Sequence, residues 1–186
     1  MSLISDINKT SEQYDQQVAV CRDVYAKKTK DYGTSWRILR PKSLTDQLFI
    51  KAQRIKTLEE TEVRKVDEGI EPEFIGLVNY AVMGMIQMKL GSDTRLELSE
   101  KEALDLYNTE IRQIKDLMLA KNHDYGEAWR SMRVSSFTDL ILSKILRIKQ
   151  IEDNKGKTII SEGIDAGYMD IVNYAIFALI QMSEGK

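Results

Sequence analysis

Only one histidine, one cysteine and two prolines occur among the 186 residues of the chain. A single histidine excludes a metal site built from several histidines, so a bound metal would need carboxylate ligands, which favour Mg or Mn over Zn. A single cysteine excludes a disulfide framework, and Cys21, at helical spacing with Val18 and Val24, is predicted to be a buried thiol. The absence of alternating polar and apolar residues indicates an all-α fold.

The chain also lacks a charge excess and a long apolar segment. A net charge of −2 and a pI near 5.6 argue against a nucleic-acid partner, because a protein that neutralises phosphates needs a basic face. The longest apolar run, near residues 174–182, is too short to span a bilayer, and the opening MSLISDINKT lacks the apolar centre of a signal peptide. We therefore expect a cytoplasmic protein without a membrane partner, in which any basic site is local.

The sequence contains an internal duplication. At an offset of 93, 15 of the 32 positions from Lys28 to Glu59 are identical, and at an offset of 94, 10 of the 21 positions from Glu68 to Met88 are identical. Such a duplication predicts two equivalent units packed about a pseudo-two-fold axis. We expect repeats at 1–91 and 100–186, with a linker at about 92–99, in one compact unit that could itself form a homodimer.

Three helices are predicted in each repeat. The first is amphipathic, and in the second repeat it opens at the capping box Ser99 to Glu102. The second is expected to begin at Ser43 or Ser136 and to end near Glu60 or Asp153. The third is almost wholly apolar, runs from Pro72 to Met88 or from Asp165 to Met182, and should be the buried centre of its unit. These helices would form a bundle.

The second helix of each repeat carries a lysine and an arginine on one face among apolar residues. Polar residues also interrupt the apolar third helices, and buried polar groups must be paired. One interpretation is a network of internal ion pairs that fixes how the third helix packs on the second. The other is a cleft in which the cations bind phosphate and the amides contact a base or sugar. The cations are Lys51, Arg54, Lys144 and Arg147, and the polar residues are Asn79, Gln87, Asp170, Asn173 and Gln181.

Between the first two helices of each repeat lie the segments DYGTSWRILR and DYGEAWRSMR. Gly33 and Gly126 are predicted to end the first helices in a left-handed conformation. The aromatic residues either cover the end of the core or contact a ligand. The arginines precede a helix N-terminus, where an anion is favoured. Candidate ligand contacts in these segments are Asp124, Tyr125, Trp129, Arg130 and Arg133, with Arg37 and Arg40 in the first repeat.

The two repeats differ at groups that could carry chemistry. Asp170 stands where the first repeat has Gly76, and His123 stands where it has Lys30. Titratable groups for acid-base or metal use are therefore concentrated in the second repeat, which favours a working site in one half. His123 is either oriented by Asp124 or serves as a cap at the end of its helix.

The segments KNHDYGEAW, KILRIKQIE and EGIDAGYMDIVNYAI resemble the nucleotide modification associated domain 1 family, in its tandem bacterial form. The resemblance implies a role in nucleotide metabolism and a distant similarity to the MazG-like all-α nucleoside triphosphate pyrophosphatases, which hold Mg with an E-x-x-E on one helix and an E-x-x-D on the next. This sequence departs from that pattern. Lys144 and Arg147 occupy the E-x-x-E position, Ala166 replaces an acid, and Asp170 remains as the main carboxylate.

These observations lead to two hypotheses. In the first, the protein binds an NTP or dNTP and acts as a pyrophosphohydrolase, in which water attacks the α-phosphorus and pyrophosphate leaves. In the second, it is a non-catalytic helical assembly or sensing module whose charged residues form structural ion pairs. In the first, Asp170 is the catalytic residue and binds Mg or Mn with Asp165 and Glu162. The phosphates contact Arg130, Arg133, Lys144 and Arg147, and the nucleoside contacts Tyr125 and Asn173. The first-repeat set is Arg37, Arg40, Lys51, Arg54 and Asn79.

Overall fold

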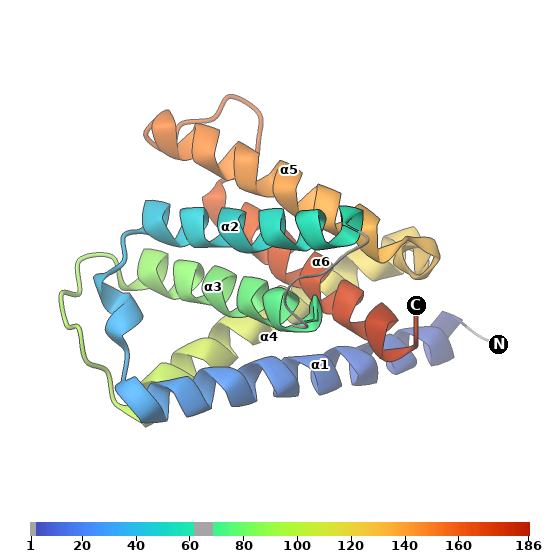
Figure 1. Ribbon diagram of the computed structural model, residues 1–186, viewed down its shortest axis with the longest axis horizontal. Helices are drawn as coiled ribbons and strands as arrows, with labels where there is room; N and C mark the ends of the chain where they lie inside the picture. Colours follow the sequence, from blue (N-terminus) through green and yellow to red (C-terminus); the bar gives the residue numbers. More distant parts are fainter. Residues whose placement is uncertain (1–2, 62–68) are drawn as a thin grey trace.

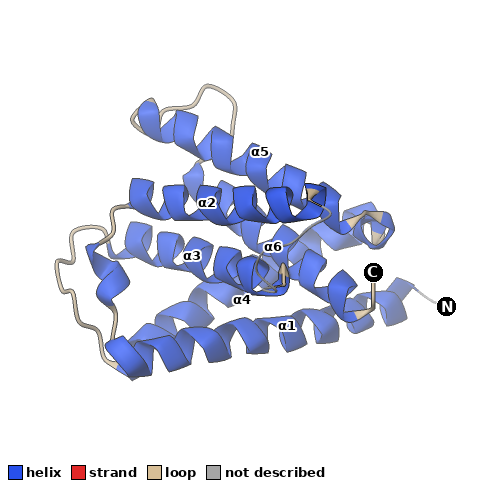
Figure 2. Ribbon diagram, in the orientation of Figure 1, coloured by secondary structure: helices blue, strands red, loops and turns tan. Residues whose placement is uncertain are grey.

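A computed structural model of the chain describes residues 3–61 and 69–186, with side chains from residue 5 onward, and the regular elements in this part are all helices (Figures 1 and 2). The same order of elements, a long helix, a short 3-10 helix and two further helices, occurs twice. The predicted all-α fold of two three-helix repeats is confirmed. The elements are α1 (Leu3–Tyr32), η1 (Ser35–Ile38), α2 (Pro41–Glu60), α3 (Glu71–Leu90), α4 (Glu100–Tyr125), η2 (Ala128–Ser131), α5 (Val134–Asp153) and α6 (Ile164–Ser183).

Each helix of the first repeat packs against its counterpart in the second. The pairs are α3 with α6, α2 with α5 and α1 with α4, while α2 also packs on α3 and α5 on α6 within each repeat. Figure 1 shows α3 and α6 in the middle of the bundle. Because these two helices are apolar on nearly all sides, they are stable only when other helices surround them. Their apolar residues, from Phe74 to Ile86 and from Tyr168 to Ile180, are mostly buried.

The second helix of each repeat begins earlier than predicted. α2 starts at Pro41 and α5 at Val134, two residues before Ser43 and Ser136. Proline suits the first turn of a helix because its fixed φ is helical and the missing N–H needs no partner there. The backbone amides of both serines already donate to the carbonyl three residues earlier, at 2.9 and 3.0 Å. The two serines therefore lie inside the first turn and are not caps.

Two other helix-end predictions are confirmed. Ser99 caps α4, its Oγ accepting a hydrogen bond from the N–H of Glu102 at 3.1 Å. Gly33 and Gly126 end α1 and α4 with φ of 70° and 59°, a left-handed conformation that favours glycine. At Gly33 a Cβ would lie 2.5 Å from Oε2 of Glu97, the end of a flexible side chain that can move, so the positive φ is what favours glycine there.

Buried hydrogen bonds join the repeats crosswise, and we call them the tyrosine–asparagine junction. The hydroxyl of Tyr107 in α4 donates to Oδ1 of Asn79 in α3 at 2.7 Å. The hydroxyl of Tyr14 in α1 donates to Oδ1 of Asn173 in α6, also at 2.7 Å. Each asparagine in turn donates its Nδ2 to a backbone carbonyl of the first helix of its own repeat. One of these carbonyls belongs to Cys21, whose buried thiol has a pKa raised by burial to about 12.

At the contact between α2 and α5, a threonine of each helix meets a glutamate of the other. Thr138 Oγ1 donates to Oε1 of Glu59 at 2.6 Å, and Thr45, whose hydroxyl binds Tyr168 and the carbonyl of Pro41, lies near Glu152. Burial raises the pKa of both glutamates, although the neighbouring threonine hydroxyls oppose the shift. Oε2 of Glu152 is buried and makes no hydrogen bond to any described residue. The ionised form of Glu152 therefore costs folding free energy.

Replacing Glu152 with glutamine is expected to stabilise the protein at neutral pH. Because the pKa is raised above its ordinary 4.5, the cost of ionisation is absent below that value, grows as pH rises toward the folded-state pKa, and is complete above it. Urea unfolding should show a gain of about 1 kcal/mol or less at pH 7 that disappears near about pH 4. The control Asp153→Asn removes the same charge from an exposed neighbour. An equal gain in both variants would contradict the prediction.

Candidate functional site

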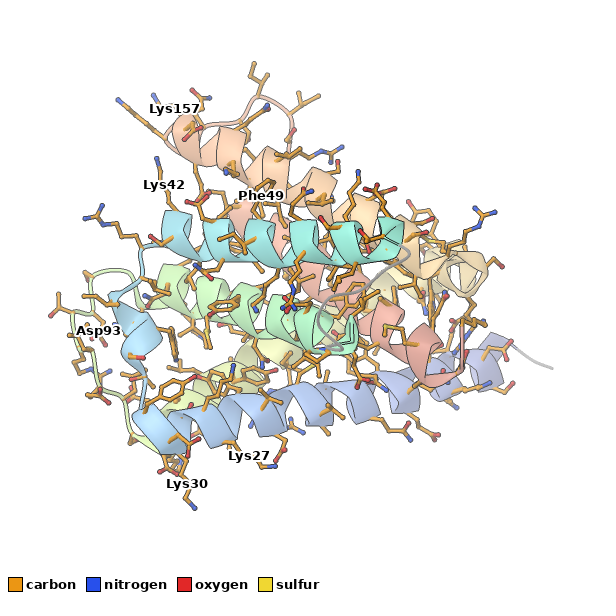
Figure 3. The ribbon with its side chains drawn as sticks, viewed as in Figure 1. Lys27, Lys30, Lys42, Phe49, Asp93 and Lys157 are labelled. Carbon is orange, nitrogen blue, oxygen red and sulfur yellow. The ribbon has the colours of Figure 1, made fainter. Side chains whose placement is uncertain are left out.

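The first arginine of the first-repeat DYG segment is bound inside the protein. The guanidinium of Arg37 is buried and donates to Oε1 of Gln87 and to the backbone carbonyls of Asp93, at 2.7 Å, and Arg95, at 3.0 Å. Figure 3 shows Asp93 beside η1 at the end of the bundle. Arg37 thus fastens the segment between α3 and α4 to η1. It is occupied by the fold and is not exposed to a ligand.

Its counterpart in the second repeat is held by a different set of groups. Arg130 lies over the ring of Trp129 at 4.4 Å, donates to Thr10 at 2.8 Å and Gln13 at 2.7 Å, and pairs with Glu127 at 3.3 Å. It thereby attaches η2 to the N-terminal half of α1. The phosphate role predicted for both arginines has no support in these contacts.

Both residues of the first-repeat lysine–arginine pair and the lysine of the second-repeat pair bind a carboxylate, at different turns of the third helix. In the first repeat, Glu73 pairs with Arg54 at 2.7 Å and with Lys51 at 3.5 Å. In the second repeat, the carboxylate is Asp170, and Lys144 lies 2.8 Å from its Oδ2. Buried carboxylates require such partners. The internal ion pairs expected under one interpretation of the sequence are therefore present in both repeats.

Comparison of the aligned positions shows that a carboxylate and a glycine have exchanged places. Gly76 occupies the position of Asp170, while Gly167 occupies the position of Glu73. At Gly76 the side chain of Lys51 fills the space, and a Cβ there would lie 2.7 Å from its methylene carbons. The buried carboxylate therefore lies about one helical turn later in the third helix of the second repeat than in that of the first.

This exchange decides which cations remain without a carboxylate. Lys121, at the end of α4, lies 2.7 Å from Oδ1 of Asp170. Desolvation lowers the pKa of Lys121, but the hydrogen bond to Asp170 and the negative charge of Asp170 raise it by more, so the pKa is raised overall. The equivalent Lys28 is exposed and has no ion pair with any described residue. Of the second-repeat pair Lys144 and Arg147, the exposed Arg147 makes no ion pair with a described residue.

Equivalent positions line a pocket in each repeat, which we call the first-repeat pocket and the second-repeat pocket. Each is formed by the first helix, the 3-10 helix and the third helix, and their volumes are about 630 Å³ and 320 Å³. Aromatic side chains form much of each wall, and a lysine of the first helix lies at each. The equivalent pairs are Lys28 with Lys121, Tyr32 with Tyr125, Trp36 with Trp129, Leu39 with Met132, Gly76 with Asp170, Asn79 with Asn173, Tyr80 with Tyr174 and Met83 with Phe177.

A further pocket of about 870 Å³ lies between α5 and the segment 154–163. Lys144, Arg147, Lys157 and Glu162 are among its lining residues. Figure 3 shows Lys157 on the loop beyond the end of α5. This loop pocket collects predicted site residues, but it is separate from the aromatic walls of the second-repeat pocket.

The predicted metal ligands do not gather into a metal site. Among residues 5–61 and 69–186, no group of three or more His, Cys, Asp or Glu side chains could hold a metal ion. Asp170 lies between two lysines, Glu162 lies in the loop pocket, and Asp165 lies in the first turn of α6. A divalent ion beside two ammonium groups would be repelled. These donors do not fit Mg or Mn, which need several convergent oxygen ligands.

Other predicted site residues lie away from the pockets or serve the fold. Arg40 and Arg133 are exposed at the start of α2 and α5, and Asp124 contacts the ring of His123 at 3.2 Å on the surface. The amides of Asn79 and Asn173 border the pockets but are bound in the tyrosine–asparagine junction. These amides were predicted to contact a ligand, but in the structure they form hydrogen bonds with groups of the protein.

Several pocket residues were missed from the sequence. Lys28 and Lys121 are identical in the two repeats, four residues before the tyrosine of each DYG segment. That identity was a usable signal, because the spacing places lysine and tyrosine one turn apart on the same helix face. The tyrosines Tyr80 and Tyr174 follow the junction asparagines and were hidden within an apolar helix. The pairing role of Glu73 had no signal beyond its place in a helix start.

None of the helices in the described residues has the length and apolarity needed to cross a membrane. The family model for nucleotide modification associated domain 1 matches the chain twice, at residues 28–88 and 121–182. Each match begins at the pocket lysine and includes most of the pocket lining of its repeat. No curated protein and no solved structure gives a match. Since the two matched regions cover more than half of the chain, the protein belongs to the nucleotide modification associated domain 1 family, with two copies of the domain in tandem.

Proposed function

We propose that the protein binds a phosphorylated nucleoside in the pocket formed by its family domain. The observation that carries the proposal is that both matched regions build a pocket at the same place from the same positions. Aromatic walls suit a base, because every base has a face that stacks on an aromatic ring. A lysine ammonium at the pocket suits a phosphate group, to which it donates charge-assisted hydrogen bonds.

Exposed aromatic residues at the pockets support a ligand contact. Tyr32 is 57% exposed and Tyr125 is 74% exposed, although each lies among pocket-lining residues. A large aromatic ring left in water at a concave site gains free energy when a ligand covers it. The lysine one turn earlier would place a phosphate beside the stacked ring.

The proposal concerns binding and includes no catalytic step. A pyrophosphohydrolase would need a group that activates water and a metal that neutralises the phosphates, and the donors around Asp170 do not fit a metal. Arg37, Arg54 and the junction asparagines are engaged inside the protein. These residues have partners within the protein, so the pockets remain as the candidate ligand sites.

A thermal-shift panel tests the proposed function. The ligands are the ribo- and deoxynucleoside triphosphates, their monophosphates and the unphosphorylated nucleosides, each with and without magnesium chloride. At one hundred times the dissociation constant, a ligand adds about 2.7 kcal/mol of stability, and for a chain of this size the expected rise in Tm is about 5 to 10 °C. Only phosphorylated ligands should produce it. No shift across the panel, or equal shifts from nucleosides, would contradict phosphate binding by lysine.

A matched pair of variants locates the binding. The double variant Lys28→Ala and Lys121→Ala should abolish the shift, because it removes the pocket lysine of each repeat. The control is Lys30→Ala, which removes a lysine from the same helix end. Figure 3 shows Lys30 extending away from the bundle. Loss of the shift in the control, or its persistence in the double variant, would place the ligand elsewhere.

A further inference from the structure

The two pockets are built from equivalent positions but present different charges to a ligand. In the second repeat, Asp170 at the pocket wall is bound from both sides, by Lys121 of the same pocket at 2.7 Å and by Lys144 of the loop pocket at 2.8 Å. Two cations with a carboxylate between them already form a satisfied anion site. A phosphate entering here would have to displace Asp170 and would meet its negative charge.

In the first repeat the equivalent position carries no carboxylate. Gly76 replaces Asp170, and Lys28 has no ion pair with any described residue. Lys51 leans across Gly76 toward Glu73 with an N–O distance of 3.5 Å, whereas Arg54 holds the same glutamate at 2.7 Å. Lys51 can therefore turn toward a ligand while Glu73 keeps its shorter ion pair.

An unpaired indole donor marks the same pocket. Nε1 of Trp36 is buried and has no hydrogen-bond partner among the described residues, and Trp36 lines the first-repeat pocket. The equivalent Nε1 of Trp129 donates to Glu127 at 2.8 Å. The position of Glu127 is occupied by Thr34 in the first repeat, and the hydroxyl of Thr34 donates to the Leu96 carbonyl. Both the lysines and the indole are thus internally satisfied only in the second repeat.

We infer that the first-repeat pocket alone binds the phosphate-bearing ligand, with Lys28 and Lys51 holding a phosphate group over Gly76. The carboxylate of Asp170 occupies the corresponding place in the second repeat and acts as a built-in substitute for the ligand anion. This inference rests on the proposed function and adds to it the location of the site and the charge of the group it selects. The greater volume of the first-repeat pocket, about 630 Å³ against 320 Å³, agrees with this assignment.

Moving the carboxylate between repeats tests the inference. Isothermal titration of the full chain uses the four deoxynucleoside triphosphates and inorganic pyrophosphate as probes. The wild type should bind one probe molecule per chain. Gly76→Asp should weaken binding by about tenfold or more. The new carboxylate would pair with the lysines that hold the phosphate, and its negative charge would repel the phosphate. The control Gly76→Asn adds a side chain of the same size that displaces Lys51 to the same extent but carries no charge, so it should lose less affinity than Gly76→Asp.

The reciprocal variant creates a site instead of removing one. Asp170→Gly frees Lys121 and Lys144 and should raise the stoichiometry from one to two molecules per chain, with circular dichroism confirming that the variant is folded. If Asp170→Gly does not fold, the single variants Lys28→Ala and Lys121→Ala decide the question, because only Lys28→Ala should weaken binding. Arg147→Ala, in the loop pocket, should leave the affinity unchanged.

The outcomes separate failure of the inference from failure of the proposed function. Two equal sites in the wild type, or loss of binding in Lys121→Ala with retention in Lys28→Ala, would overturn the inference while nucleotide binding stands. Loss of binding in Arg147→Ala alone would move the site to the loop pocket and overturn it as well. Absence of binding in both the wild type and Asp170→Gly would overturn the proposed function itself.

Discussion

Replacing Arg37 with alanine is expected to lower the free energy of unfolding by about 3 to 5 kcal/mol, the range for removing one partner from a buried charged network. The loss follows because the variant leaves Oε1 of Gln87 and two backbone carbonyls without their donor. It also removes the contacts of Arg37 with the segment between α3 and α4, which is then held at the start of η1 by the hydrogen bonds of Thr34 with Leu96 and Leu98. Urea unfolding followed by circular dichroism measures the loss of free energy. A thermal melt should show a Tm lower by about 6 to 20 °C.

The equivalent variant Arg130→Ala is the matched control. The side chain of Arg130 is 23% exposed, whereas that of Arg37 is 4% exposed. Water can hydrogen-bond to much of what Arg130 leaves behind in its variant. The free energy of unfolding should therefore fall by about 1 kcal/mol. Equal losses at the two positions would show that burial does not set the cost.

Replacing Asn79 with leucine should destabilise the protein by about 2 to 4 kcal/mol, because two buried groups lose their partners. These groups are the hydroxyl of Tyr107 and the carbonyl of Cys21. Chemical unfolding at neutral pH measures the loss. In a double-mutant cycle, Tyr107→Phe should cost less in the Asn79→Leu background than in the wild type, since its hydrogen bond is already absent.

The repeat supplies its own control for this second variant. Asn173→Leu breaks the other half of the tyrosine–asparagine junction, with Tyr14 in place of Tyr107. Its cost should match that of Asn79→Leu to within about 1 kcal/mol, a margin set by context dependence of buried hydrogen bonds. A much smaller loss at either asparagine would show that the junction stabilises only one side of the bundle.

The helices and their duplication could be predicted from the sequence because both are local patterns. Apolar spacing identifies a helix face, and identical residues at a fixed offset identify a repeat. The ends of α2 and α5 at Glu60 and Asp153 and the cap at Ser99 agree with the prediction. The starts of α2 and α5 were misplaced, because a serine followed by an acid resembles a cap wherever it lies in the first turn.

The partners across the bundle could not be predicted in the same way. Tyr14 and Asn173 are 159 residues apart, and no sequence spacing relates a residue of α1 to one of α6. The lysines of the second helices were expected to need partners, but the choice between Glu73 and Asp170 depends on how each third helix is rotated against its neighbours. The pocket itself arises from that same packing, so its lining residues were recognised only in part.

The exchange of Glu73 and Gly76 for Gly167 and Asp170 has a consequence for how such a protein can change. In a pair of identical chains, every substitution appears on both sides of the symmetry axis at once, so a mutation that blocks one site blocks its twin. Covalent fusion of the two copies removes that coupling. A carboxylate can then arise in the pocket of one copy without arising in the other. The first copy still contributes its helices to the bundle, and the pocket of the second copy is unaffected.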